Sequence, residues 1–345
     1  MGGWVDLDMR RYLSILLFLG LAFWGCEEEQ DTTPPVDKWW EDYLDYQYLD
    51  LGGSNLTGDF PPEIGDMTNL IELALYNNEL TGSIPPEIGN LTNLTYLNLY
   101  DNQLTGPIPP EIENMTNLTY LSLGANQLTG SIPAELWNMT QMNYLYLNYT
   151  ELTGSIPPEV GNMTNMIDFI LHNNRFTGEI PSEIGSMTNL ELLYLRENQL
   201  SGSLPPEIGD LTNLTYLSLG SNQLAGSIPP EIGNMASLLG LNLYNNQLTG
   251  EIPSEIWDMT NLVALNLFNN QLTGFIPPEI DNLTSMTMLK LQDNQLNGDI
   301  PESICELNIT WSDSNRFNLS NNQFCPPYPS CIEDYMGVQD TTNCN

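Results

Sequence analysis

The chain has 345 residues, of which 44 are Asp or Glu and only 7 are Lys or Arg, so its formal net charge at pH 7 is −37. A protein with so few cations cannot neutralise phosphate groups, which excludes nucleic-acid binding through basic patches and docking to an anionic membrane surface. The chain is not a disordered acidic segment, because 41% of it is apolar and only 15% is charged. The composition therefore predicts a folded protein that is acidic because bases are rare.

Residues 1–25 resemble a secretory signal peptide. Arg10 and Arg11 precede an apolar run that is too short to span a bilayer. The run ends in Gly25 and Cys26, which resembles the site where bacterial lipoproteins are cleaved and lipidated. We therefore predict an exported protein of the bacterial cell envelope or cell surface, held to the membrane only by a lipid on Cys26. An ordinary signal peptide, and hence a secreted protein, is the alternative.

A 24-residue repeat fills most of the chain. The segment from Leu118 to Leu123 alternates Leu with outward-facing residues, the pattern of a strand with one buried face. Asn126 follows, and a buried Asn can hydrogen-bond backbone groups of neighbouring coils. A Gly-Ser-Ile-Pro turn and a short helical or 3₁₀ segment from Glu135 complete the unit. The second Leu of the strand segment recurs every 24 residues, at Leu49, Leu73, Leu97, Leu121, Leu145, Phe169, Leu193, Leu217, Leu241, Leu265 and Leu289.

A looser last copy lies at Phe317, 28 residues after Leu289. One repeat cannot bury its Leu face alone, so the units must stack into a single solenoid of about twelve coils. The predicted organisation is a polar tether over 26–36, an N-terminal cap over 37–48, the repeats over 49–324 and a C-terminal cap over 325–345.

The repeat L-x-x-L-x-L-x-x-N-Q-L-T-G-x-I-P-P-E-I-G-N-M-T-N resembles the plant-specific type of leucine-rich repeat. The resemblance implies an α/β repeat solenoid, curved and right-handed, with parallel concave strands and short 3₁₀, helical or extended convex segments. Members of that family mostly bind proteins, peptides or small ligands through outward strand positions, and the repeats perform no chemistry. We therefore expect an extracytoplasmic protein that binds a protein, peptide or glycan on its concave face. The alternatives are a structural or adhesive surface protein without a discrete site, and an inhibitor of a polysaccharide-degrading enzyme.

Four cysteines near the C-terminus predict two disulfides in an exported chain, with three pairings to choose from. Cys305 lies 16 residues after Leu289 and Cys331 lies 14 after Phe317, so consecutive coils place these two cysteines nearly above one another. We therefore favour the pairs Cys305 with Cys331 and Cys325 with Cys344. Metal ligation is less favoured, because the paired C-x-x-C spacing is missing.

Aromatic residues recur at the outward strand positions. With strands about 4.8 Å apart, their rings predict a continuous aromatic surface across roughly 50 Å. A wide exposed aromatic patch usually marks an interaction site, whereas packing between strands without a ligand is the alternative reading. The candidate ligand-binding rings are Tyr76, Tyr96, Tyr100, Tyr120, Tyr144, Tyr146, Tyr149, Tyr194, Tyr216, Tyr244 and Phe268.

A polar cluster is expected at the middle of this surface, formed by Asp168, His172, Tyr194, Arg196 and Glu197. It could hold an anionic group such as a peptide carboxylate or an acidic sugar. Alternatively, its bases only reduce the repulsion among neighbouring acids. Asp168 and His172 lie about 13 Å apart along one strand, too far for an orienting hydrogen bond. No G-x-S-x-G or H-E-x-x-H motif occurs. We predict no enzyme activity, cofactor or metal, although calcium along the Glu column of the convex turns stays open.

Overall fold

The structure is a computed structural model that describes residues 39–344. The predicted signal peptide, the lipidation site Cys26 and the tether lie outside the described residues, as does the start of the N-terminal cap. Within the described part of the chain, no helix has the length and apolar character needed to cross a bilayer.

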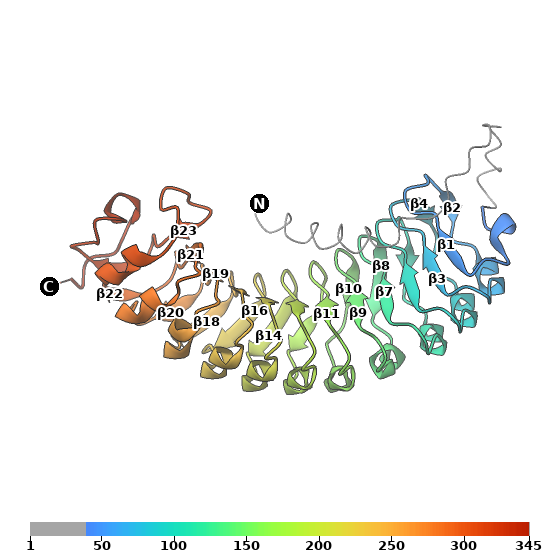
Figure 1. The fold of residues 1–345 in the computed structure, drawn as a ribbon, viewed down its shortest axis with the longest axis horizontal. Helices are drawn as coiled ribbons and strands as arrows, with labels where there is room; N and C mark the ends of the chain where they lie inside the picture. Colours follow the sequence, from blue (N-terminus) through green and yellow to red (C-terminus); the bar gives the residue numbers. More distant parts are fainter. Residues whose placement is uncertain (1–38, 345) are drawn as a thin grey trace. The chain divides into compact units, whose positions relative to one another are not determined.

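The repeating Leu positions build a parallel sheet of twelve strands, which lines the concave side of the solenoid (Figure 1). Each strand pairs with the strand of the next coil in the register of the repeat, so Leu97 lies opposite Leu73 and Leu121. These Leu residues are fully buried while their strand neighbours face outward to varying degrees. The strands are β1 (Tyr48–Asp50), β3 (Glu72–Ala74), β5 (Tyr96–Asn98), β7 (Tyr120–Ser122), β9 (Tyr144–Tyr146), β11 (Asp168–Ile170), β13 (Leu192–Tyr194), β15 (Tyr216–Ser218), β17 (Gly240–Asn242), β19 (Ala264–Asn266), β21 (Met288–Lys290) and β23 (Phe317–Asn318).

The L-T-G part of each repeat forms a second strand, and these strands pair in parallel into shorter sheets. Gly130 shows why Gly recurs there, because its φ of +80° is a conformation that residues with a side chain rarely adopt. The second strands are β2 (Thr57–Asp59), β4 (Glu79–Thr81), β6 (Thr105–Gly106), β8 (Gln127–Ser131), β10 (Glu151–Thr153), β12 (Thr177–Glu179), β14 (Gln199–Ser203), β16 (Gln223–Gly226), β18 (Gln247–Glu251), β20 (Gln271–Thr273), β22 (Asn297–Asp299) and β24 (Gln323–Cys325).

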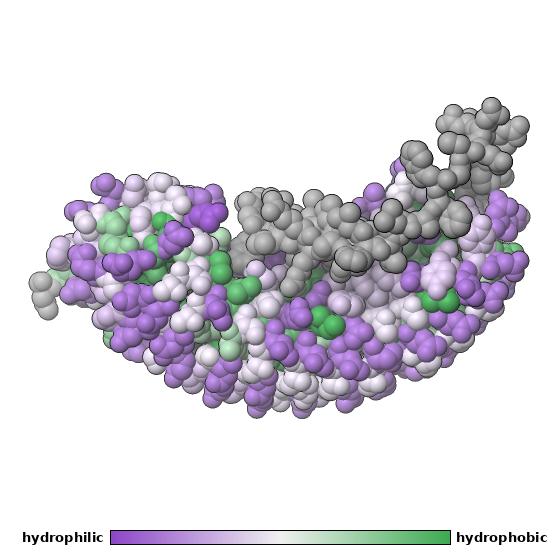
Figure 2. All heavy atoms as spheres, in the orientation of Figure 1, coloured by the Kyte–Doolittle hydropathy of each residue, from purple (hydrophilic) through white to green (hydrophobic). Residues whose placement is uncertain are grey.

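Short 3₁₀ helices form the convex turns, where hydrophilic residues are frequent at the surface (Figure 2). Pro commonly begins these helices, because Pro lacks an N–H group and the first N–H of a helix has no intrahelical partner. A Glu follows in the first turn, where its negative charge is favourable. The convex helices are η3 (Pro62–Asp66), η4 (Pro86–Asn90), η5 (Pro110–Asn114), η6 (Ala134–Asn138), η7 (Pro158–Asn162), η8 (Ser182–Ser186), η9 (Pro206–Asp210), η10 (Pro230–Asn234), η11 (Ser254–Asp258), η12 (Pro278–Asn282) and η13 (Glu302–Glu306). Two further 3₁₀ helices, η2 (Glu41–Tyr43) and η14 (Glu333–Tyr335), lie before β1 and after β24.

A ladder of buried Asn side chains ties consecutive coils together, as the repeat predicts. Asn126 Nδ2 donates to the carbonyl oxygens of Leu99 and Leu123, and its Oδ1 accepts from the Leu104 N–H. Thr150 replaces Asn at one ladder position, and its hydroxyl lies within hydrogen-bond distance of two acceptors, the Leu147 carbonyl at 3.1 Å and the Asn174 side-chain oxygen. Each coil therefore has its buried backbone groups satisfied partly by the next coil.

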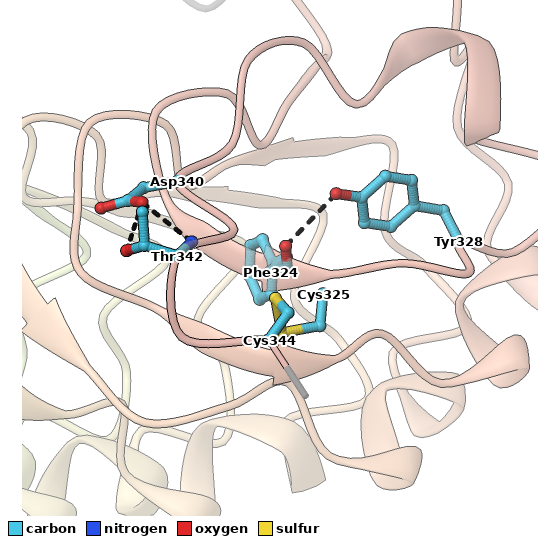
Figure 3. The surroundings of a disulfide bond; sticks show 6 residues. All are labelled: Phe324, Cys325, Tyr328, Asp340, Thr342 and Cys344. Carbon is cyan, nitrogen blue, oxygen red and sulfur yellow. Dashed lines mark hydrogen bonds between the residues drawn. A yellow bond between two sulfur atoms is a disulfide. The ribbon is translucent and has the colours of Figure 1, made fainter.

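Both ends of the hydrophobic core are covered. Trp39 is only 3% exposed and packs edge-to-face on Trp40 at 5.8 Å between ring centroids. At the C-terminal end, disulfides join Cys305 to Cys331 and Cys325 to Cys344, the pairs that the spacing favours. Figure 3 shows the second disulfide beside Phe324, whose carbonyl oxygen accepts a hydrogen bond from the Tyr328 hydroxyl. These contacts close ends that would otherwise expose apolar side chains.

Candidate functional site

Tyrosine rings from neighbouring strands meet on the concave sheet. The rings of Tyr96 and Tyr120 stack with centroids 4.2 Å apart and an interplanar angle of 18°. Tyr120 also contacts Tyr144 and Tyr146 at 5.8 and 5.3 Å. Tyr146 donates from its hydroxyl to Asp168 Oδ2 at 2.7 Å, which joins the rings to the predicted polar cluster. Strands β5, β7, β9 and β11 thus present one aromatic surface bordered by a carboxylate.

The predicted polar cluster at the middle of the sheet is assembled around His172 and Arg196. Tyr149 and Tyr194 lie on either side of the imidazole, at 5.1 and 6.1 Å between ring centroids. Arg196 Nη1 forms an ion pair with Glu197 Oε1 at 2.8 Å. Burial opposes the charge of Arg196, but Glu197 and Tyr149 outweigh it, so the pKa of the guanidinium is raised. Arg196 therefore stays cationic at the centre of the concave face.

His172 is far more buried than an outward-facing position implies. Its side chain is 3% exposed, and Nδ1 has no hydrogen-bond partner among the described residues. Burial first, and the charge of Arg196 second, lower the pKa of His172 from 6.5 to about 3. The imidazole is therefore neutral at ordinary pH and adds no positive charge to the cluster.

A second aromatic pair lies further along the sheet. Tyr244 and Phe268 stack at 4.9 Å with an interplanar angle of 9°, and Lys290 Nζ lies 5.1 Å above the Phe268 ring. This geometry is a cation–π contact. The Tyr244 ring lies over Gly220, where an added Cβ would come within 2.5 Å of it. Because Gly220 has no side chain, the Tyr244 ring can pack directly against the backbone of the sheet.

The prediction of one continuous, exposed aromatic surface needs correction. Ring contacts form a large group from β5 to β15 and a separate Tyr244–Phe268 pair, and the next strand carries Gly240 at the repeat position of Tyr216. Tyr146 and Tyr194 are 5% and 9% exposed, so they serve mainly as packing beneath the surface. Ser122, predicted to face outward, is also buried.

The two other basic side chains among residues 39–344, those of Arg175 and Arg316, form ion pairs with acids. Arg175 pairs with Glu151 at 3.0 Å, and Arg316 pairs with Asp313 at 3.5 Å. Among residues 39–344, no group of three or more His, Cys, Asp or Glu side chains is placed to hold a metal ion.

Two regular features of the site were missed at the sequence level. The third residue after the end of a concave strand adopts a positive φ in coil after coil, including Ala125, Tyr149 and Glu197. A second Asn ladder lies on the exposed side of the coils, where Asn117 Nδ2 donates to the Thr92 carbonyl at 2.9 Å. The recurrence of Asn93, Asn117, Asn165, Asn189 and Asn213 at one repeat position was a signal for this second ladder.

Comparison with known families agrees with this architecture. A model described as "Leucine Rich repeats (2 copies)" matches residues 68–114, 92–135 and 188–232. A model described as "Leucine Rich Repeat" matches residues 165–187, 237–259, 261–283 and 285–307. The chain belongs to the leucine-rich-repeat family. A search of curated protein sequences found no match.

Solved structures give three informative similarities. A TDR receptor is 34% identical with a TM-score of 0.77, covering 83% of this chain and 49% of the receptor chain. The plant peptide hormone receptor RGFR1 in complex with RGF2 is 32% identical with a TM-score of 0.61, covering 84% and 54%. The LRR protein LIC12759 of Leptospira interrogans is 33% identical with a TM-score of 0.63, covering 78% and 71%. The chain thus spans about half the length of the two receptor chains.

Proposed function

We propose that the protein is an exported binding protein that recognises a protein or peptide segment on its concave face. The observation that carries this proposal is the ring cluster of Tyr96, Tyr120 and Tyr144, which spreads across the neighbouring strands β5, β7 and β9 of the concave sheet. Aromatic residues and Arg supply much of the binding energy at protein interfaces, because they offer large contact areas with a polar end.

Similarity to the plant peptide hormone receptor RGFR1, solved in complex with RGF2, supports a peptide as the ligand. Such a ligand fits a surface built of parallel strands, since successive coils offer similar contacts about 4.8 Å apart. Arg196 is cationic but already pairs with Glu197 at 2.8 Å, so an acidic group of the ligand at this point would compete with that carboxylate. Binding, rather than catalysis, is the function that this arrangement supports.

Binding can be tested with a displayed peptide library of random sequence, selected on the purified protein. A double variant, Tyr120→Ala with Tyr144→Ala, should lose at least about tenfold in affinity for the selected peptides. Phe275→Ala is a matched control, because Phe275 is 58% exposed and lies outside the concave strands. Peptides that bind the double variant as well as the wild type would overturn the concave site and favour an adhesive protein without a discrete site.

Export and lipid anchoring at Cys26 are part of the proposal. The two disulfides support export, because disulfides persist in oxidising compartments. Metabolic labelling with a fatty-acid analogue should mark the wild-type protein and leave Cys26→Ser unlabelled. Equal labelling of both proteins would overturn lipidation at this residue, and no labelling of either would favour a secreted protein.

A further inference from the structure

The N-terminal half of the solenoid contains neither Lys nor Arg. No Lys or Arg occurs from Trp39 to Asn174, although acids occur throughout this stretch. Three of these acids lie on the concave strands, namely Asp50, Glu72 and Asp168, and Asp101 lies in the turn after β5. A surface whose charges all have one sign raises the local concentration of ligands of the other sign. The concave face from β1 to β11 is therefore a negative surface.

The same half carries the densest tyrosine group. Tyr96 stacks on Tyr120, and the Tyr76 ring lies over Gly52, where an added Cβ would be 2.3 Å from the ring. Burial first, and the charge of Asp50 second, raise the pKa of Tyr76. Asp50 therefore lies within electrostatic reach of this ring. An aromatic ring is negative at its face, so rings and carboxylates here favour the same kind of ligand.

We infer that the concave surface of β1 to β11 binds a basic peptide segment, whose Lys or Arg side chains lie over the tyrosine rings beside Asp50, Glu72, Asp101 and Asp168. This inference rests on the proposed function, because it names the charge of the ligand for the same concave surface. The stems of Lys and Arg pack on the rings while their charged groups reach the carboxylates.

The other end of the sheet supplies an example of this contact within the chain. Lys290 Nζ lies 5.1 Å above the Phe268 ring, which occupies the same repeat position as Tyr76 and Tyr100. A concave ring at this position can therefore hold an ammonium group above its face. From β1 to β11 the chain has no such cation of its own.

A peptide fits better than a metal ion or a single small cation. The described acids form no three-residue group suited to a metal ion. They are instead distributed over β1, β3, β11 and the turn after β5, with rings between them. Such a spread matches several cations carried on one extended chain.

The test compares labelled peptides of one sequence that differ only in charge. One carries Lys at alternate positions, the second carries acetyl-lysine there, and the third carries Glu. Binding to the purified protein is measured by fluorescence anisotropy at about 20 and about 200 mM NaCl. The Lys peptide should bind at least about tenfold more tightly than the acetylated one, and the difference should shrink at the higher salt concentration.

Variants separate the concave surface from the general negative charge. Asp50→Asn with Glu72→Gln should weaken binding of the Lys peptide by about fivefold or more. Tyr96→Leu with Tyr120→Leu should weaken it similarly, whereas Tyr96→Phe with Tyr120→Phe should keep most of the affinity, since Phe retains the ring face. A matched charge control is Glu87→Gln with Glu207→Gln on the convex helices η4 and η9.

Equal weakening by the concave and convex charge variants would show that net charge alone attracts the peptide, and would overturn the inference. Equal binding of the Lys and acetylated peptides would overturn it too. If peptides selected from the random library bind the tyrosine surface but are neutral or acidic, the inference fails while the proposed function stands. If no selected peptide depends on that surface, the proposed function itself fails.

Discussion

Asn126 Nδ2 donates a hydrogen bond to the carbonyl oxygen of Leu99, one coil earlier, at 2.9 Å. The same side chain also serves Leu123 and Leu104, so one amide satisfies buried backbone groups of two coils. Asn126→Leu should therefore lower the free energy of unfolding by about 2–4 kcal/mol, because buried N–H and C=O groups lose their partners. Urea unfolding followed by circular dichroism measures this loss.

Asn117→Ala is the control for this prediction. Asn117 also donates to a carbonyl of the preceding coil, that of Thr92, but this bond is exposed and water can replace it. Its loss should cost less than about 1 kcal/mol. Equal destabilisation by the two variants would show that burial does not decide the strength of the ladders.

Gly209 allows two convex helices to approach closely. A Cβ added at Gly209 would lie 2.3 Å from the backbone oxygen of Glu231 in the next coil. Gly209→Ala should therefore destabilise the protein by about 1–3 kcal/mol, because backbone cannot move aside as a flexible side chain can. Thermal or urea unfolding of the purified variant gives this value.

Glu113→Ala tests whether this effect depends on position alone. Glu113 occupies in η5 the place that Gly209 occupies in η9, so that coil already accommodates a side chain. The substitution should change the free energy of unfolding by less than about 0.5 kcal/mol. A loss as large as that of Gly209→Ala would mean that the close approach is not the cause.

The repeat period made most of the fold predictable, because residues such as Leu73 and Leu97 can be buried on only one face of a strand. Each coil also repeats the same residue types at the same positions, so the structure expected for one repeat can be extended to the next. The Asn ladder and the disulfide pairs follow from this regularity, since residues at equivalent positions of consecutive coils lie near one another.

The candidate surface was less predictable, because its geometry depends on neighbours from different coils. His172 occupies an outward column, yet Tyr149 and Tyr194 beside it help to bury the imidazole. The position with positive φ after the concave strands holds residues as different as Ala125 and Glu197. The residue type there therefore does not predict the left-handed backbone conformation. Side-chain size on adjacent strands, rather than the repeat pattern, decides which outward residues are exposed.

The Cys305–Cys331 disulfide should stabilise the C-terminal cap. Its partners are 26 residues apart, and loop closure of this length corresponds to about 3–4 kcal/mol. Cys305→Ser with Cys331→Ser should lower stability by roughly this amount, and amide hydrogen exchange should accelerate first in β23 and β24. Exchange that accelerates equally in β1 and β3 would contradict a local role of this disulfide.

His172 should make the protein less stable as the pH falls below neutrality. In the unfolded chain His172 takes up a proton near pH 6.5, whereas in the folded protein burial, followed by the charge of Arg196, lowers its pKa to about 3. Between these values the unfolded state binds more protons, so stability decreases with decreasing pH by up to about 1.4 kcal/mol per pH unit. Above pH 6.5 the residue has no such effect.

Urea unfolding at several pH values between 7 and 5 measures this slope, and His172→Gln should make it shallower. Because His172 is the only histidine in the chain, a protein purified without a histidine tag gives one imidazole signal by nuclear magnetic resonance. That signal should stay constant from about pH 8 to about pH 5 in the folded protein. A titration midpoint near 6.5 would show that the imidazole is accessible to solvent, and would contradict the burial at the centre of the concave face.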